Sequence, residues 1–154
     1  MNNELQDIVI TIDTHEEANK NEKTRIKTIQ EWGLKYGAEV EFQELKLCDY
    51  RLMGEFHGVP VNLGIEYKTM SNWCADDYQE NKDKLFAACD LYDQVALFIE
   101  AGNYEFKADG FGETNISCFI KKDLIITGKL AIFEGCCSTL SSYGIHVRQL
   151  RSEE

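Results

Sequence analysis

Residues 95–99 restrict the fold more than any other segment, because every residue in this run is apolar. A strand with apolar side chains on both faces needs cover on both sides, which is typical of a buried strand in an α/β protein. No apolar stretch approaches the roughly 18 residues that a membrane-spanning helix needs. We therefore expect a central strand in a sheet flanked by helices, and no membrane partner.

The N-terminal segment predicts a strand, a loop and a helix. Residues 7–13 form a short apolar run that is typical of a buried strand, and the polar stretch 14–23 is expected to be a loop. Asn21 or Thr24 can cap the following helix, and Gly37 is a good C-terminal stop.

The next segments predict three strands. Apolar and polar residues alternate over residues 38–47, and residues 49–56 and 61–69 read as a hairpin joined by a turn-rich linker. Alternation along the second hairpin strand places Glu66 and Lys68 on one face, two residues apart.

The second half predicts a helix over residues 71–92, capped by Ser71 and broken near Asn81. Residues 102–120 contain glycine and polar residues and are expected to form a long loop. Apolar residues at helical spacing favour a helix over 123–143, and residues 145–150 a last strand. The order β-α-β-β-β-α-β-α-β indicates an α/β fold with a mixed sheet.

The chain's 154 residues suit one domain spanning positions 1–154. The start of the chain has no signal-peptide pattern, so we expect an intracellular protein, cytoplasmic or nucleoid-associated. The six cysteines lack Cys-x-x-Cys spacing and lie mostly in apolar segments, which favours reduced structural thiols over a zinc site.

The net charge of −11 counts against a simple nucleic-acid binder, because binding phosphates normally needs a basic surface. One local basic cluster stands in the first half of the chain, at Lys20, Lys23, Arg25 and Lys27. This cluster is either a solvated helix start or a set of phosphate contacts.

Asp49, Glu66 and Lys68 are the residues most suited to chemistry. Mg²⁺ and Mn²⁺ prefer carboxylate oxygens, and a hairpin could bring Asp49 and Glu66 together. A lysine beside them can orient a water and stabilise developing negative charge. With 27 acidic residues in the chain, however, this spacing also arises in an ordinary surface hairpin with outward-facing charges.

Further motifs accompany this trio along nearly the whole chain. In order they are Ile12-Asp13-Thr14-His15-Glu16, Cys48-Asp49-Tyr50, Ile65-Glu66-Tyr67-Lys68-Thr69-Met70-Ser71-Asn72, Phe98-Ile99-Glu100-Ala101-Gly102, Gly128-Lys129-Leu130 and Tyr143-Gly144-Ile145. They resemble the XPF-type structure-specific endonuclease domain of the PD-(D/E)XK superfamily. The corresponding family patterns are Asp-x-Arg-Glu, Gly-Asp-Tyr, Ile-Glu-Arg-Lys-x-x-x-Asp, Ile-Glu-Gly, Gly-x-Leu and Tyr-Gly-Ile.

The resemblance implies a restriction-endonuclease-like mixed sheet flanked by helices, and a DNA-repair type of endonuclease. Asp49 and Glu66 would bind Mg²⁺ or Mn²⁺, and Lys68 would be the catalytic lysine. Asp13 and Glu16 would be acidic catalytic partners at the rim, with Asp13 a further metal ligand. The expected reaction is hydrolysis of phosphodiester bonds in DNA, with branched, flapped or junction-containing DNA as the expected partner.

Three departures from the family pattern leave a second hypothesis open. Tyr67 and His15 stand where the family has arginine, and Asn72 stands where it has aspartate. Tyrosine cannot replace the bidentate phosphate contact of arginine. The alternative is therefore a weak or inactive nuclease-fold module that binds DNA or a partner protein. No helix-hairpin-helix module is expected within the chain, and a homodimer or heterodimer remains open.

Overall fold

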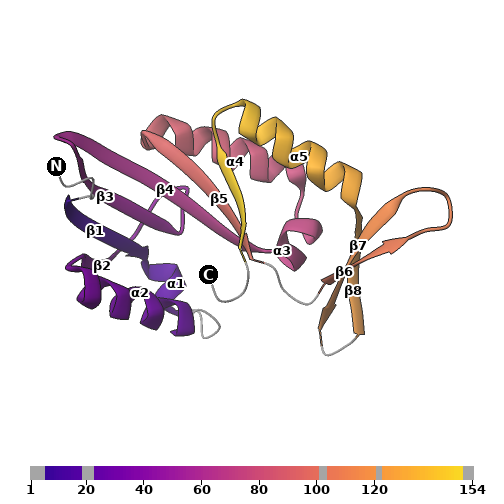
Figure 1. Ribbon diagram of the computed structural model, residues 1–154, viewed down its shortest axis with the longest axis horizontal. Helices are drawn as coiled ribbons and strands as arrows, with labels where there is room; N and C mark the ends of the chain where they lie inside the picture. The colour runs from indigo at the N-terminus through magenta and orange to yellow at the C-terminus, as the bar shows by residue number, and fades with distance from the viewer. Residues whose placement is uncertain (1–5, 19–22, 101–103, 121–122, 151–154) are drawn as a thin grey trace. The chain divides into compact units, whose positions relative to one another are not determined.

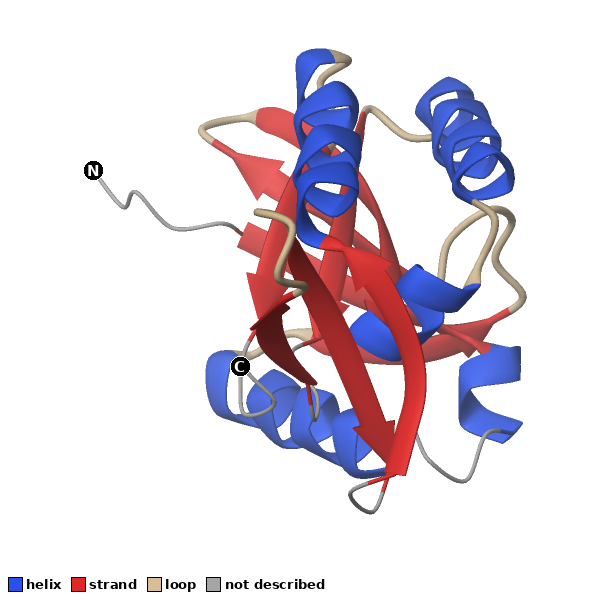
Figure 2. Cartoon of the chain, turned by 90° about the vertical axis from the view of Figure 1, so that its right-hand side faces the viewer, coloured by secondary structure: helices blue, strands red, loops and turns tan. Residues whose placement is uncertain are grey.

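The computed structural model describes residues 6–18, 23–100, 104–120 and 123–150, which form an alternation of helices and strands (Figures 1 and 2). The chain divides into two compact units, which we describe separately: Met1–Glu66 with Phe86–Val95, and Tyr67–Leu85 with Ala96–Glu154. Among the sequence predictions, those on Lys20, Asn21 and the Ala101-Gly102 part of a motif lie outside the described residues.

The fold class predicted from the sequence is confirmed, since a mixed sheet flanked by helices is present. Six strands form this sheet in the order β2-β1-β3-β4-β5-β9. The strands are β1 (Gln6–Asp13), β2 (Glu39–Gln43), β3 (Tyr50–Phe56), β4 (Val59–Thr69), β5 (Gln94–Glu100) and β9 (His146–Leu150). Strands β4 and β5 each contribute residues to both units. The apolar run that predicted a buried strand lies in β5, where Leu97 and Ile99 are fully buried.

In the first unit, β1 pairs in parallel with β2 and antiparallel with β3. Helix α2 (Lys23–Tyr36) lies beside β2, and Gly37 ends it at a φ of 72° (Figure 1). The predicted strand, helix and Gly37 stop are therefore confirmed. The predicted loop over 14–23 is wrong in its first part, because the short helix α1 (Thr14–Ala18) follows β1 directly.

The predicted hairpin is present as β3 and β4, paired antiparallel from Tyr50 opposite Ile65 to Phe56 opposite Val59. His57 and Gly58 form a two-residue turn, and both have positive φ, at 51° and 78°. Two-residue turns of this kind match the twist of the strands they join, so they set the register. This register determines where the acidic residues of β4 lie relative to β3.

The second unit corrects two predictions. Residues expected to form a long loop instead form β6 (Tyr104–Ala108) and β7 (Thr114–Ile120), which pair antiparallel. The segment expected to be one helix is a strand, β8 (Asp123–Lys129), followed by α5 (Leu130–Ser142). The apolar run at the start of β8 contains β-branched residues, which favour a strand where a partner such as β7 is present.

The predicted helix over residues 71–92 is two helices, α3 (Met70–Ala75) and α4 (Tyr78–Leu91). Thr69, and not Ser71, caps α3, because its side chain accepts a hydrogen bond from the Asn72 N–H. The break lies at Asp76 and Asp77 rather than near Asn81. Asp77 accepts the N–H of Glu80 and so begins α4. None of the helices within the described ranges is both long and apolar enough to cross a bilayer.

Gly64 on β4 allows a close approach that the first unit needs. A Cβ at this position would lie 2.6 Å from the Tyr92 ring. The Tyr92 hydroxyl donates to the Lys46 carbonyl at 2.7 Å and lies 3.0 Å from the Cys48 thiol. Gly64 therefore allows Tyr92 to anchor the segment that leads into Asp49.

We predict that Gly64→Ala destabilises the protein by about 1–3 kcal/mol, because the added methyl group displaces the Tyr92 ring. The matched control is Gly135→Ala on α5, where a Cβ meets nothing within 4 Å. That change should raise stability by about 0.5–1 kcal/mol, since alanine favours a helix interior. Urea unfolding measures both variants. Equal effects in the two would contradict the packing described for Gly64.

Candidate functional site: acidic residues at the ends of three strands

Backbone hydrogen bonds join the segments that carry Asp13, Asp49 and Glu66. The Asp13 N–H donates to the Asp49 carbonyl at 2.9 Å, and the Asp49 N–H donates to the Ile65 carbonyl at 2.9 Å. Asp13 ends β1, Asp49 directly precedes β3, and Glu66 directly follows Ile65 on β4. The structure therefore brings together the backbones of three of the predicted site residues, at the end of β1, just before β3 and within β4.

The Asp13 carboxylate is almost buried, and both of its oxygens have partners. Oδ1 accepts the Leu45 N–H at 2.9 Å, and Oδ2 lies 3.1 Å from Nδ1 of His15. Asp13 is 6% exposed, whereas the His15 side chain is 78% exposed. Asp13 thus holds the chain after β2 in place through Leu45, in addition to any role as a metal ligand, which remains a prediction.

Glu66 and Asp49 share the surroundings of the Cys48 thiol. Glu66 is buried at 4% exposure, and Asp49 is half-buried. Burial raises the pKa of Cys48, and the negative charges of Asp49 and Glu66 raise it further. Both carboxylates therefore lie within electrostatic reach of one buried group. Burial disfavours the charged form of a carboxylate, and a bound cation would offset that cost.

Glu16 belongs to a hydrogen-bonded network with Arg25 and Tyr50. The Tyr50 hydroxyl donates to Glu16 Oε2 at 2.9 Å, and the Arg25 guanidinium donates to Tyr50 at 2.9 Å and to Glu16 at 3.3 Å. Burial raises the pKa of Tyr50 far above its usual range, although the Arg25 charge lowers it. Tyr50 is therefore a neutral donor, and the network ties α1 and α2 to β3. A catalytic role for Glu16 stays a prediction.

The sequence alone did not reveal the roles of Arg25 and Tyr50 in this network. The sequence places Arg25 in a basic cluster that is either a solvated helix start or a set of phosphate contacts. In the structure its side chain is 21% exposed and forms an ion pair with Glu16. Lys27, from the same cluster, is exposed and lies 3.8 Å from Glu31. The sequence contains no spacing that relates Arg25 to Glu16 and Tyr50, because packing of α2 against the strands creates the contact.

Lys68, the predicted catalytic lysine, lies in the second unit with Asp76. Its ammonium donates to Asp76 Oδ2 at 2.7 Å. Lys68 and Glu66 both belong to β4, two residues apart, as the alternation predicted. Tyr67 stands between them, and Asn72 lies within α3.

The donor types fit a hard divalent cation, but the side chains do not form a ready cage. Among residues 6–18, 23–100, 104–120 and 123–150, no group of three or more His, Cys, Asp or Glu side chains is placed to hold a metal ion. Mg²⁺ is usually bound through one or two carboxylates together with waters and substrate phosphates, rather than by an all-protein cage. A site formed by Asp49 and Glu66 with substrate is compatible with both observations.

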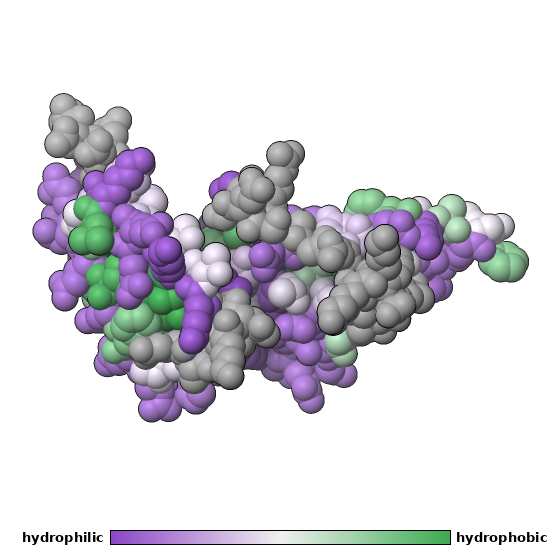
Figure 3. Space-filling model, turned by 90° about the horizontal axis from the view of Figure 1, so that it is seen from below, coloured by the Kyte–Doolittle hydropathy of each residue, from purple (hydrophilic) through white to green (hydrophobic). Residues whose placement is uncertain are grey.

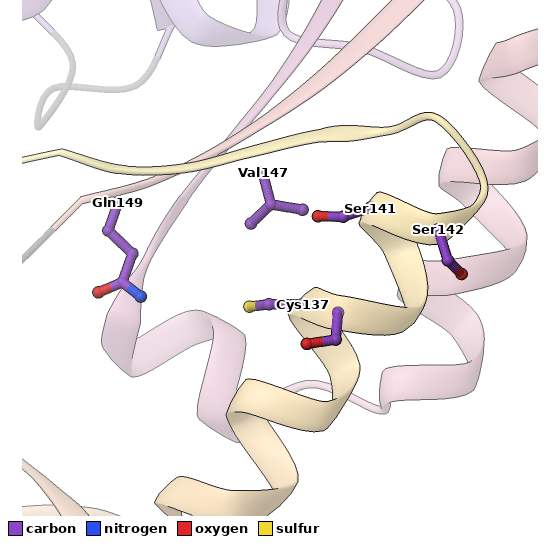
Figure 4. Close-up of a pocket in the computed structure, with 6 residues that line it drawn as sticks. Cys137, Ser141, Ser142, Val147 and Gln149 are labelled. Atoms are coloured by element: carbon purple, nitrogen blue, oxygen red, sulfur yellow. The ribbon is translucent and has the colours of Figure 1, made fainter.

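A shallow pocket of about 660 Å³ lies elsewhere, between α5 and β9 in the second unit (Figure 4). Its lining residues are Cys137, Ser138, Ser141, Ser142, Val147 and Gln149. Burial raises the pKa of Cys137 to about 11, so this thiol is protonated at neutral pH. None of the predicted site residues lines the pocket, and it contains no charged side chain.

Exposed hydrophobic residues of the first unit include Trp32, Leu34 and Tyr36 on α2. The Trp32 and Tyr36 rings contact each other at a tilt of 39°, with centroids 4.9 Å apart. Figure 3 shows hydrophobic surface among mostly hydrophilic residues on the face seen from below. Scattered exposed apolar residues are normal for a soluble surface, so these residues alone define no site.

Comparison with known proteins supports the fold. No protein-family model matches the chain, and no curated protein sequence matches it. Among solved structures, XPF from Aeropyrum pernix is similar, with a TM-score of 0.53 and 16% sequence identity. The likeness covers 93% of this chain and 53% of the XPF chain, so this chain spans about half the length of that protein. The chain therefore has a nuclease-like fold.

We predict that Tyr50→Phe destabilises the protein by about 1–3 kcal/mol, because Arg25 and Glu16 lose their shared hydroxyl partner. Tyr36→Phe is the matched control, since Tyr36 is 55% exposed. That variant should stay within about 0.5 kcal/mol of the wild type. Thermal and urea unfolding measure the difference. A Tyr50 variant as stable as the wild type would show that the network contributes nothing to folding.

Proposed function

We propose that this chain is a metal-dependent endonuclease that hydrolyses phosphodiester bonds in DNA. The observation that carries the proposal is the pair of backbone bonds through Asp49, which joins the strand ends bearing Asp13 and Glu66. The nuclease-like fold supports it, because the likeness to XPF extends over nearly the whole chain.

In this proposal Asp49 and Glu66 hold Mg²⁺ or Mn²⁺, and Asp13 contributes an acidic side chain next to them. The ion would polarise the scissile phosphate and lower the pKa of a bound water. Lys68, two residues after Glu66 on β4, would orient the attacking water and stabilise negative charge on the phosphate. Glu16 would keep the rim acidic while the Arg25 and Tyr50 contacts hold it in position.

The proposed substrate is DNA with a branch, flap or single-strand/double-strand junction, met in the cytoplasm or nucleoid. The net charge of −11 limits contact with long duplex DNA. Tyr67 also gives no bidentate phosphate contact of the kind that arginine supplies. Affinity would therefore depend on the bound cation and on local DNA structure, with a second copy or another subunit as a possible source of further contacts.

The first test is cleavage of labelled branched DNA by purified protein in Mg²⁺ or Mn²⁺. Glu66→Gln and Asp49→Asn should each lower the rate by roughly 100-fold or more, because each removes a ligand charge. Glu55→Gln, an exposed acid on β3, is the control and should cut like the wild type. If Glu66→Gln cuts as fast as the wild type, the assigned site does not perform the reaction.

A second candidate function is a non-catalytic module that keeps the nuclease fold and binds DNA or a partner protein. It is favoured by the engagement of Lys68 with Asp76 and of Asp13 with Leu45 and His15. In such a module these contacts would serve folding alone.

Calorimetry with Mn²⁺ separates the two functions without requiring cleavage. The endonuclease proposal predicts that wild type binds roughly one ion and that Asp49→Asn abolishes the heat. Glu55→Gln should bind like the wild type. A wild-type protein that binds no Mn²⁺, even with branched DNA present, would favour the non-catalytic module.

A further inference from the structure

Lys68 and Asp76 form a short ion pair whose two side chains are partly buried. The two groups meet at 2.7 Å, and their side chains are 18% and 40% exposed. A lysine side chain has four rotatable bonds and carries a point charge, so an ammonium without a fixed partner occupies many positions. A hydrogen bond from the ammonium to the Asp76 carboxylate restricts these positions.

Helix α3 connects Lys68 to Asp76 and brings the two side chains into contact. Thr69, directly after Lys68, begins the helix by accepting the Asn72 N–H at 3.1 Å. Asp76 ends it, and its own N–H donates to the Asn72 carbonyl at 2.9 Å. The helix is anchored from within its unit, because Met70 is 2% exposed and Trp73 is 6% exposed. The length of α3 thus determines where the Asp76 carboxylate lies.

We propose that Asp76 is the positioning residue for Lys68, because its carboxylate accepts the Lys68 ammonium at 2.7 Å. This inference rests on the proposed endonuclease function. Asp76 holds the ammonium at the end of β4 without contacting substrate, so that Lys68 enters the reaction already oriented. Half-exposed ion pairs contribute little to folding, so the main effect of Asp76 is on the rate.

The test compares Asp76→Asn with the charge-conserving variant Asp76→Glu in the cleavage assay. Asp76→Asn should lower kcat by roughly 10-fold and leave KM within about 2-fold, because misplacing Lys68 affects the transition state more than binding. Asp76→Glu should recover most of the loss. Asp90→Asn, an exposed acid on α4, should have no effect. Melting temperatures should stay within about 4 °C of the wild type.

A second readout does not depend on cleavage. In NMR spectra of ¹⁵N-lysine-labelled protein, the Lys68 ammonium should give a signal protected from exchange, assigned through its absence in Lys68→Arg. The signal should shift or vanish in Asp76→Asn and return in Asp76→Glu.

The outcomes separate this inference from the function on which it rests. Wild-type kcat in Asp76→Asn, with Glu66→Gln still inactive, would overturn the positioning role and leave the endonuclease intact. A faster Asp76→Asn would overturn it as well, by showing that Asp76 restrains Lys68. Equal activity of wild type and Glu66→Gln would overturn the proposed endonuclease and this role together.

Discussion

The two hydrogen bonds through the Asp49 peptide are the interactions on which the candidate site depends. They connect the end of β1 to the start of β3, and the start of β3 to β4 at Ile65. Because these are backbone bonds, they determine where the acidic residues lie whatever rotamers the side chains adopt. The surroundings support the same segment: Tyr92 anchors Lys46, and Asp13 anchors Leu45. Burying a carboxylate such as that of Glu66 is unfavourable unless hydrogen bonds or an opposite charge compensate, and the backbone bonds hold the segments around it in place.

The parts of the fold that sequence predicted are those with strong local signals. The apolar run of β5, the hairpin of β3 and β4 and the Gly37 stop each depend on signals over a few residues, so their patterns survive in the structure. The predicted hairpin linker of residues 57–60 is shorter in the structure, because Val59 and Pro60 belong to β4. The strand β8 was missed because short apolar runs suit a helix or a strand equally well by periodicity. The strands β6 and β7 were missed because the glycine and polar residues of 102–120 favoured a loop. Tertiary pairing decides between the two states, and the sequence of one segment does not contain its partner.

The candidate site shows the same division. The predicted strand that carries Glu66 and Lys68 is present as β4, and the backbone bonds through Asp49 join the segments that carry Asp13 and Glu66. The partners of these residues were not predictable. Arg25 reaches Glu16 only because α2 packs beside the sheet, and Asp76 reaches Lys68 only because α3 is short. These contacts link residues whose spacing carries no recognisable pattern, yet they determine how the predicted residues are held.

The proposed endonuclease site requires Asp49 and Glu66 to converge on one divalent cation. A crystal of the protein with Mn²⁺ and a short branched DNA, measured for anomalous scattering at the manganese edge, tests this convergence. We expect an anomalous peak within about 2.0–2.3 Å of carboxylate oxygens from both Asp49 and Glu66. A crystal at saturating Mn²⁺ with no peak there, or with a peak bound only by other residues, would contradict it.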